Sequence, residues 1–223
     1  MRYNKIRKMD ISNGPGVRVS VFLQGCSFHC KNCFNPETWD FDGGDEFTEE
    51  TVKEIMDLCS KSHIKGLSIL GGEPMHPNNI KATEEIAKKF KEKYPEKNLW
   101  VWSGYTFEDY ISKQNVAKYI DVIVDGQYND ELHNPKLEWR GSENQRVIDV
   151  QKSLKNKKVE LWEKWFIINK KLVSLYFIFK RRSQFIIWIG SYWYYYIFNC
   201  RILLLNLILG WFKFIDFINF IKG

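Results

Sequence analysis

The stretch VRVSVFLQGCSFHCKNC, residues 17–33, joins an apolar run to three closely spaced cysteines. Val17, Val19 and Val21 recur at every second position, which is the period of a β-strand with one buried face. Cys26, Cys30 and Cys33 follow within ten residues of that run, in the spacing C-x3-C-x2-C. The stretch therefore predicts a strand that ends in a loop carrying three thiols.

Working outward from this strand, two periods alternate along the first 162 residues. Apolar runs predict further strands, and helical spacing predicts helices between them. The predicted strands are 66–70, 98–103 and 121–126, with weaker candidates at 146–150 and 157–162; the predicted helices are 48–62, 78–95 and 106–119. Strands that alternate with helices in this way predict an α/β fold built on a parallel sheet with right-handed crossovers.

The unusual residues fall where the predicted strands end. GCSFHC follows the first strand, GGEP the second, SGYT the third and DGQY the fourth. Ligands of α/β folds bind at the carboxyl ends of parallel strands. We therefore expect one site on that edge of the sheet, with the cysteine loop in it.

Charge divides the chain into two parts. Residues 1–162 hold 24 Lys and Arg against 25 Asp and Glu, a net of −1, whereas residues 163–223 hold 9 against 2, a net of +7. The basic excess of the whole chain therefore belongs to the last part, and residues 1–162 show no charge pattern typical of a nucleic-acid-binding face. We expect a single domain over 1–162 and an appended segment over 163–223.

The appended segment has an atypical composition. It contains 18 of the 36 aromatic residues of the chain and no Ala, Pro, Thr, Met or His. This bias towards the residues of A/T-rich codons favours a product of frameshift or read-through. A membrane-associated segment, flanked by the cytoplasmic charges of 180–182, and a buried extension are the alternatives.

The thiols are expected to be reduced. The N-terminal residues lack the apolar region of a secretory signal, which predicts a cytoplasmic protein. Clustered cysteines in a reducing compartment are typical of metal ligands or catalysts. Three thiolates suit an iron–sulfur cluster with one iron left without a protein ligand.

A zinc site is the alternative interpretation, and it needs a fourth ligand. The candidates are His29, Cys59, His63 and His76. Cys59 lies on the apolar stripe of the predicted helix 48–62, so we expect it in the core as a small apolar residue.

The cysteine spacing resembles the signature of the radical S-adenosylmethionine (SAM) superfamily. That resemblance implies a [4Fe–4S] cluster on Cys26, Cys30 and Cys33, whose open iron chelates SAM. Reductive cleavage of SAM then yields a 5′-deoxyadenosyl radical, so no side chain is expected to act as a catalytic acid or base. The resemblance extends to GGEP and to positions beside the last cysteine, which implies a SAM pocket formed by Asn32, Cys33, Phe34, Gly71, Gly72, Glu73 and Pro74.

Longer stretches narrow the resemblance. DISNGPGVRVSVFLQGCSFHCKNCFNPETWD, LSILGGEPMHPNN and PKLEWRGSENQRVIDV are similar to the activating proteins of anaerobic (class III) ribonucleoside-triphosphate reductases. The likeness covers residues 1–162 and implies a partial (β/α) barrel, open on one side. It also implies formation of a glycyl radical on the large reductase subunit, with a flavodoxin- or ferredoxin-like electron donor. An activase of the pyruvate formate-lyase type and a zinc-bearing interaction module are the alternatives.

Other residues near the strand ends are weaker candidates. Asp125 is interpreted either as a ribose-hydroxyl contact or as a turn cap, and Lys31 as a solvated side chain. The remaining candidates are Ser103, Gly104 and Tyr105 facing the pocket, Gly126, and Arg140, Gly141 and Asn144 at the partner surface or barrel edge.

Overall fold

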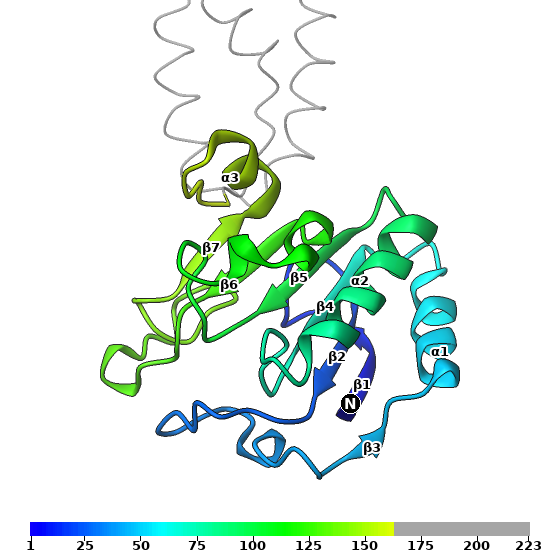
Figure 1. Ribbon diagram of the computed structural model, residues 1–223, viewed down its shortest axis with the longest axis horizontal. Helices are drawn as coiled ribbons and strands as arrows, with labels where there is room; N and C mark the ends of the chain where they lie inside the picture. Colours follow the sequence, from blue (N-terminus) through cyan, green and yellow to red (C-terminus); the bar gives the residue numbers. More distant parts are fainter. Residues whose placement is uncertain (163–223) are drawn as a thin grey trace, which may run out of the picture. The chain divides into compact units, whose positions relative to one another are not determined.

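The computed structural model describes residues 1–162; the segment 163–223, including Cys200, lies outside the described residues. Seven strands form one sheet in the order β3-β1-β2-β4-β5-β6-β7 (Figure 1). The strands are β1 (Arg2–Asp10), β2 (Arg18–Leu23), β3 (Asp45–Glu46), β4 (Gly66–Gly71), β5 (Asn98–Trp102), β6 (Val122–Asp125) and β7 (Arg146–Asp149). The α-helices are α1 (Glu49–Cys59), α2 (Ile80–Lys93) and α3 (Val150–Asn156).

The four central strands confirm the predicted parallel sheet. β2, β4, β5 and β6 pair in parallel, whereas β1, β3 and β7 pair antiparallel at the two sides. A parallel neighbour requires a crossover, usually a helix, and neither 11–17 nor 126–145 contains an α-helix. The predicted parallel arrangement therefore holds for the central strands and not for those at the two sides. The sheet is mixed and does not close on itself.

One face of the sheet carries the apolar core. Val19 and Val21 of β2, with Ile69 of β4, pack in one cluster with Ile55 of α1 and Phe90 of α2. Figure 1 shows α2 in front of the central strands and α1 beside it. Cys59 is fully buried in the same cluster, which confirms its predicted place in the core.

The other face of the sheet is more polar. Arg18 is fully buried there and donates to Ser68 Oγ at 2.7 Å, Leu67 O at 2.7 Å and Asn98 Oδ1 at 2.5 Å. Its guanidinium also lies 5.7 Å from the ring of Trp100. Burial lowers the pKa of Arg18 to about 10, so it stays charged at neutral pH. These contacts satisfy its donors with neutral acceptors.

The predicted helix 48–62 is confirmed as α1. Thr48 is its N-cap, and its hydroxyl forms a capping box with Thr51. The side-chain oxygen satisfies a backbone N–H that lacks a partner in the helix, which fixes where the helix starts. Glu49 and Glu50 occupy the first turn, where the helix dipole favours negative charge.

The predicted helix 106–119 is wrong. This stretch forms two 3₁₀ helices, η2 (Ile111–Lys113) and η3 (Asn115–Tyr119), separated by Gln114 in an extended conformation. Its buried Ile111 and Val116 are five residues apart, which does not match one face of an α-helix. The weak strand candidate 157–162 is also wrong, because only a single bridge from Leu161 to Ile148 forms there.

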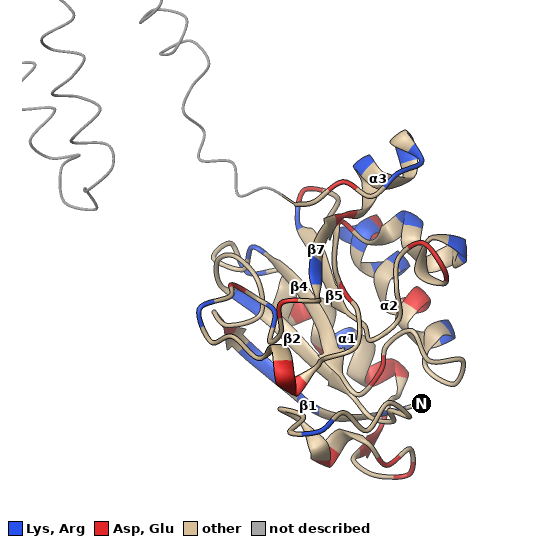
Figure 2. Ribbon diagram, turned by 90° about the vertical axis from the view of Figure 1, so that its left-hand side faces the viewer, with Lys and Arg blue, Asp and Glu red and all other residues tan. Residues whose placement is uncertain are grey.

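Two findings concern the surface of the described part. Acidic and basic residues are interspersed over the ribbon (Figure 2), in line with the net charge of −1 for 1–162. Among residues 1–162, no helix has the length and apolar character needed to cross a membrane.

Candidate functional site

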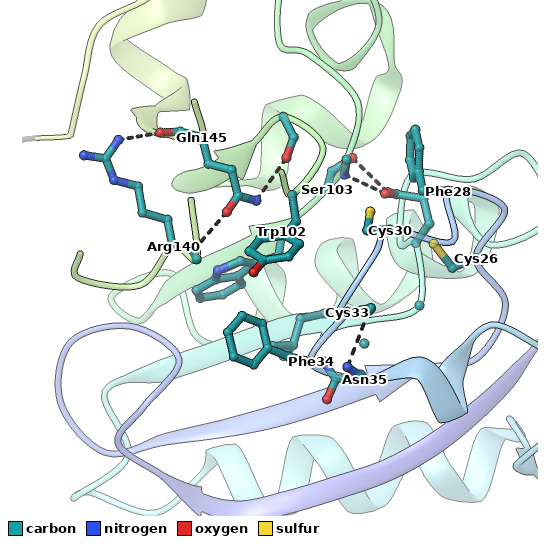
Figure 3. A pocket seen from close by; sticks show the side chains of 18 of the residues that line it. Cys26, Phe28, Cys30, Cys33, Phe34, Asn35, Trp102, Ser103, Arg140 and Gln145 are labelled. Carbon is teal, nitrogen blue, oxygen red and sulfur yellow. Dashed lines mark hydrogen bonds between the residues drawn. The ribbon is translucent and has the colours of Figure 1, made fainter. Parts of the chain in front are cut away.

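The loops after the four parallel strands meet around one cavity of about 380 Å³. Cys26, Cys30 and Cys33 come from the loop after β2, and Figure 3 shows them around the same space as Phe34 and Trp102. Gly71, Gly72 and Glu73 follow β4, Ser103 and Gly104 follow β5, and Gly126 follows β6. The expected edge of the sheet thus carries the cavity.

The cysteine loop is held by its backbone. Gly25 N donates to Thr38 O at 2.8 Å and Cys26 N to Trp39 O at 3.0 Å, which anchors its first residues. Between the cysteines, His29 and Asn32 have positive φ of 45° and 54°. Such conformations are costly for residues other than Gly and are concentrated at ligand sites. These turns bring all three cysteines to the cavity wall.

The three cysteines are free thiols and half-buried. Burial raises the pKa of Cys26 to about 11, with nearby Glu73 and Cys30 adding to the shift. The thiol of Cys26 is therefore neutral in the metal-free chain, and it must lose its proton to bind a metal. Within residues 1–162, no three His, Cys, Asp or Glu side chains converge closely enough to hold a single metal ion.

The GGEP loop is hydrogen-bonded to the cysteine loop. Gly72 N donates to Leu23 O at 2.9 Å and Glu73 N donates to Gly25 O at 2.8 Å. Gly71 has a φ of +106°, which favours glycine, and a Cβ there would lie 2.7 Å from Leu23 N. A Cβ on Gly72 would lie 2.5 Å from Gly25 O. Only glycines allow the two loops to approach this closely.

The carboxylate of Glu73 joins the GGEP loop to the SGYT loop. Oε1 accepts from Met75 N and from Ser103 Oγ, both at 2.8 Å, and Oε2 accepts from Gly104 N at 2.7 Å. Its side chain is almost fully buried, and burial raises its pKa to about 7 despite these hydrogen bonds. Glu73 therefore fixes the relative position of two walls of the cavity.

The loop between β6 and β7 provides the remaining wall. Phe34 is 68% exposed and its ring lies 5.7 Å from that of Tyr128. Trp102 Nε1 donates to Trp139 O at 2.7 Å. Asn32 donates to Asp130 Oδ2 at 2.9 Å, so the cysteine loop is also attached to this wall.

The structure brings most of the predicted site residues together. Those that line the cavity are Cys26, Cys30, Cys33, Phe34, Gly71, Gly72 and Glu73. Asn32 and Pro74 do not line it: Asn32 bonds to Asp130, and Pro74 O accepts from Thr83 Oγ1 at 2.8 Å.

The weaker candidates divide in the same way. Ser103, Gly104, Gly126, Arg140 and Gly141 line the cavity. Tyr105 stacks on Tyr110, and Asp125 pairs with Arg146. Lys31 and Asn144 line a neighbouring cavity of about 480 Å³, and Lys31 also pairs with Asp130 at 3.6 Å.

Nine further lining residues are not among the predicted site residues, although Phe28 and Tyr128 belong to loops expected at this edge: Ser12, Asn13, Phe28, Asn35, Leu70, Trp102, Tyr128, Trp139 and Gln145. Phe28 and Asn35 had a usable signal, because they lie within or beside the cysteine loop. Trp102 and Trp139 had none, since tryptophan is at least as common in cores as in sites.

The residues present fit an iron–sulfur cluster with an open iron. Three thiols from one loop line the cavity, and the facing wall contains two glycines that expose backbone rather than side chains. Cysteine thiolates are the usual protein ligands of such clusters. The donor set and the space beside it are therefore of the right chemistry.

Comparison with known proteins agrees with this site. A family model described as 4Fe-4S single cluster domain matches residues 12–148. An anaerobic ribonucleoside-triphosphate reductase-activating protein of Enterobacteria phage T4 is 45% identical over 147 residues, which are 66% of this chain and 93% of the relative. The proteins of that name from Vibrio cholerae and Escherichia coli K12 are 41% and 37% identical over 150 residues, 66% of this chain and 97% of each relative. The chain therefore belongs to the family of anaerobic ribonucleoside-triphosphate reductase-activating proteins.

Proposed function

We propose that this protein activates an anaerobic ribonucleoside-triphosphate reductase by generating a glycyl radical on its large subunit. One observation carries the proposal: three free thiols of the β2 loop and the Gly71–Gly72–Glu73 loop line the same cavity. The names of the relatives support the target, and the match to a 4Fe-4S domain supports the cluster. The reaction is a radical SAM oxidoreductase reaction in the cytoplasm, where thiols stay reduced.

Each part of the cavity has a role in this proposal. Cys26, Cys30 and Cys33 hold a [4Fe–4S] cluster through their thiolates. When bound, the cluster and SAM together supply the one-electron cleavage that produces a hydrogen-abstracting 5′-deoxyadenosyl radical. Gly71 and Gly72 line the cavity with backbone alone, and the lack of a Cβ lets this wall lie close against Leu23 and Gly25.

The other residues of the predicted SAM pocket either form its wall or hold its loops in place. Phe34 offers an exposed aromatic face, and Glu73 holds the GGEP and SGYT loops in register. Asn32 and Pro74 act one step away from the cavity, by fixing the cysteine loop and the GGEP loop. No side chain is required as a general acid or base.

The open sheet suits a protein substrate. The sheet is not closed, which supports the expected partial barrel that is open on one side. A segment of the reductase subunit that carries the glycine can then reach the cavity, and the electron comes from a flavodoxin- or ferredoxin-like donor.

The cofactor chemistry is tested by anaerobic reconstitution of the full chain with iron and sulfide. We expect a reducible [4Fe–4S] signal in electron paramagnetic resonance, and 5′-deoxyadenosine from SAM after reduction. Cys30→Ala is expected to abolish both, whereas Cys59→Ala leaves both intact because Cys59 belongs to the core. Tight binding of zinc with no iron signal would instead support an interaction module.

The target is tested by mixing the loaded protein with candidate subunits. The glycyl radical signal should form on the anaerobic reductase and not on pyruvate formate-lyase. The reverse preference would show that the target is wrong while leaving the SAM chemistry in place.

A further inference from the structure

Asn79 occupies the N-cap position of α2 but does not cap it. Asn is among the best N-cap residues because its side chain accepts from the first N–H groups of the helix. Here the side chain makes no such hydrogen bond, although its carbonyl starts the helix by accepting from Thr83 N at 3.0 Å. The side-chain amide of the buried Asn79 therefore forms its hydrogen bonds outside the helix.

The amide of Asn79 reaches the two loops of the candidate site. Nδ2 lies 3.0 Å from Gln24 O, 3.2 Å from Gly25 O and 3.0 Å from Glu73 O. The three acceptors are all carbonyl oxygens, which identifies the atom facing them as the nitrogen of the amide. The side chain is 2% exposed, so water does not compete for these contacts.

These contacts join the residues that precede Cys26 to the residue that follows Gly72. Gln24 and Gly25 lead directly into the first thiol, and Glu73 N already donates to Gly25 O. One turn further along α2, Thr83 Oγ1 donates to Pro74 O at 2.8 Å. The start of α2 therefore holds the cysteine loop and the GGEP loop together from behind the cavity.

We propose that Asn79 is a positioning residue, which fixes the cysteine loop against the GGEP loop and so sets the geometry between the cluster thiols and the SAM wall. The expected effect on SAM binding rests on the proposed function. The contacts of Asn79 with the two loops do not depend on that function. It assigns Asn79 no contact with SAM or with the cluster, since it does not line the cavity.

Two substitutions separate this role from helix capping. Asn79→Ser keeps a preferred N-cap residue but is too short to reach three carbonyls. Asn79→Asp keeps the shape and favours the helix start, yet it places a carboxylate without a donor against those oxygens. Thr48→Ala, which removes the cap of α1, is the matched control for helix destabilisation away from the site.

Hydrogen exchange of the full chain without iron measures the effect directly. In Asn79→Ser we expect the amide of Glu73 to exchange roughly tenfold faster, because the loop that accepts its hydrogen bond is released. Amides in the second half of α2 should keep their protection. Thr48→Ala should leave Glu73 unchanged and affect only the start of α1.

SAM binding to the reconstituted protein gives the second readout. We expect its dissociation constant to rise roughly tenfold in Asn79→Ser and more in Asn79→Asp, and to stay unchanged in Thr48→Ala. Unchanged exchange at Glu73, or equal loosening along all of α2, would overturn the inference. So would global unfolding of Asn79→Ser, because loss of a local contact leaves the sheet intact. If the unsubstituted protein binds no SAM, the proposed function fails, while the exchange result still decides the role of Asn79.

Discussion

Asp125 and Glu108 share the guanidinium of Arg146, and they provide a quantitative test of how burial sets the contribution of an ion pair to stability. Asp125 Oδ2 lies 2.6 Å from Arg146 Nη2, and Glu108 Oε2 lies 2.7 Å from the same atom. Asp125 also accepts from Phe107 N at 2.8 Å. The two carboxylates differ in exposure, because the side chain of Asp125 is 1% exposed and that of Glu108 is 51% exposed.

Exposure decides the expected loss of stability. Removing one partner of a fully buried pair costs roughly 3–5 kcal/mol, and partial exposure of Arg146 reduces this to about 2–3 kcal/mol for Asp125→Asn. Glu108→Gln removes a surface partner and costs about 0.5 kcal/mol. Glu108 is the larger cause of the raised pKa of Arg146, but solvent around it weakens its contribution to folding.

Thermal unfolding of the two variants is the assay. At roughly 2–4 °C per kcal/mol for a chain of this size, Asp125→Asn should lower Tm by about 4–12 °C and Glu108→Gln by about 1–2 °C. SAM affinity should stay nearly unchanged in both, because Asp125 bonds to Phe107 and Arg146, and neither of these residues lines the cavity. Equal Tm values for the two variants would refute the reasoning. Loss of SAM affinity in Asp125→Asn at unchanged Tm would restore the interpretation of Asp125 as a ribose contact.

Three further predictions concern the loops and the core. Gly72→Ala, whose Cβ would lie 2.5 Å from Gly25 O, should lower iron content after reconstitution; iron content equal to that of the unsubstituted protein would contradict this. In the iron-free chain, burial raises the pKa of Glu73 from its ordinary 4.5 to about 7. Its protonated form therefore contributes stability below pH 4.5, and this contribution is lost as the pH rises through about 7. Glu73→Gln should remove that part of the pH dependence of Tm, and an unchanged profile would count against it. Cys59→Ser should lower Tm more than Cys59→Ala, because it buries an added hydroxyl in an apolar core; the opposite order would place Cys59 outside that core.

The central strands and the first two helices were predictable because their packing is simple. Val19 and Val21 of β2, like Leu67 and Ile69 of β4, enter the core at every second position, which leaves a period of two in the sequence. α1 and α2 each bury one face, which leaves a regular apolar stripe. The loops could be placed at one edge because parallel strands have their carboxyl ends together.

The first strand and the third predicted helix were not predictable by the same signals. β1 is RYNKIRKMD, a charged strand that lies near the edge of the sheet and is largely unburied. Its pairing with β2 is set by backbone hydrogen bonds, which leave no apolar period in the sequence. In 106–119, the buried Ile111 and Val116 do not share one helical face, and Gln114 separates the segment into two short 3₁₀ helices.

The GGEP loop shows that the sequence can identify which residues belong to the site without showing what each of them contacts. Its Glu73 was expected to contact SAM, yet the carboxylate is occupied by Met75 N, Ser103 Oγ and Gly104 N. Its two glycines have no side chain to offer, and their backbone is fitted against Leu23 and Gly25. A ligand in this cavity therefore meets mainly backbone from the GGEP loop, while its acidic side chain and Asn79 hold that backbone in place. Substitution of Asn79 should then alter SAM binding as strongly as substitution of a residue that lines the cavity.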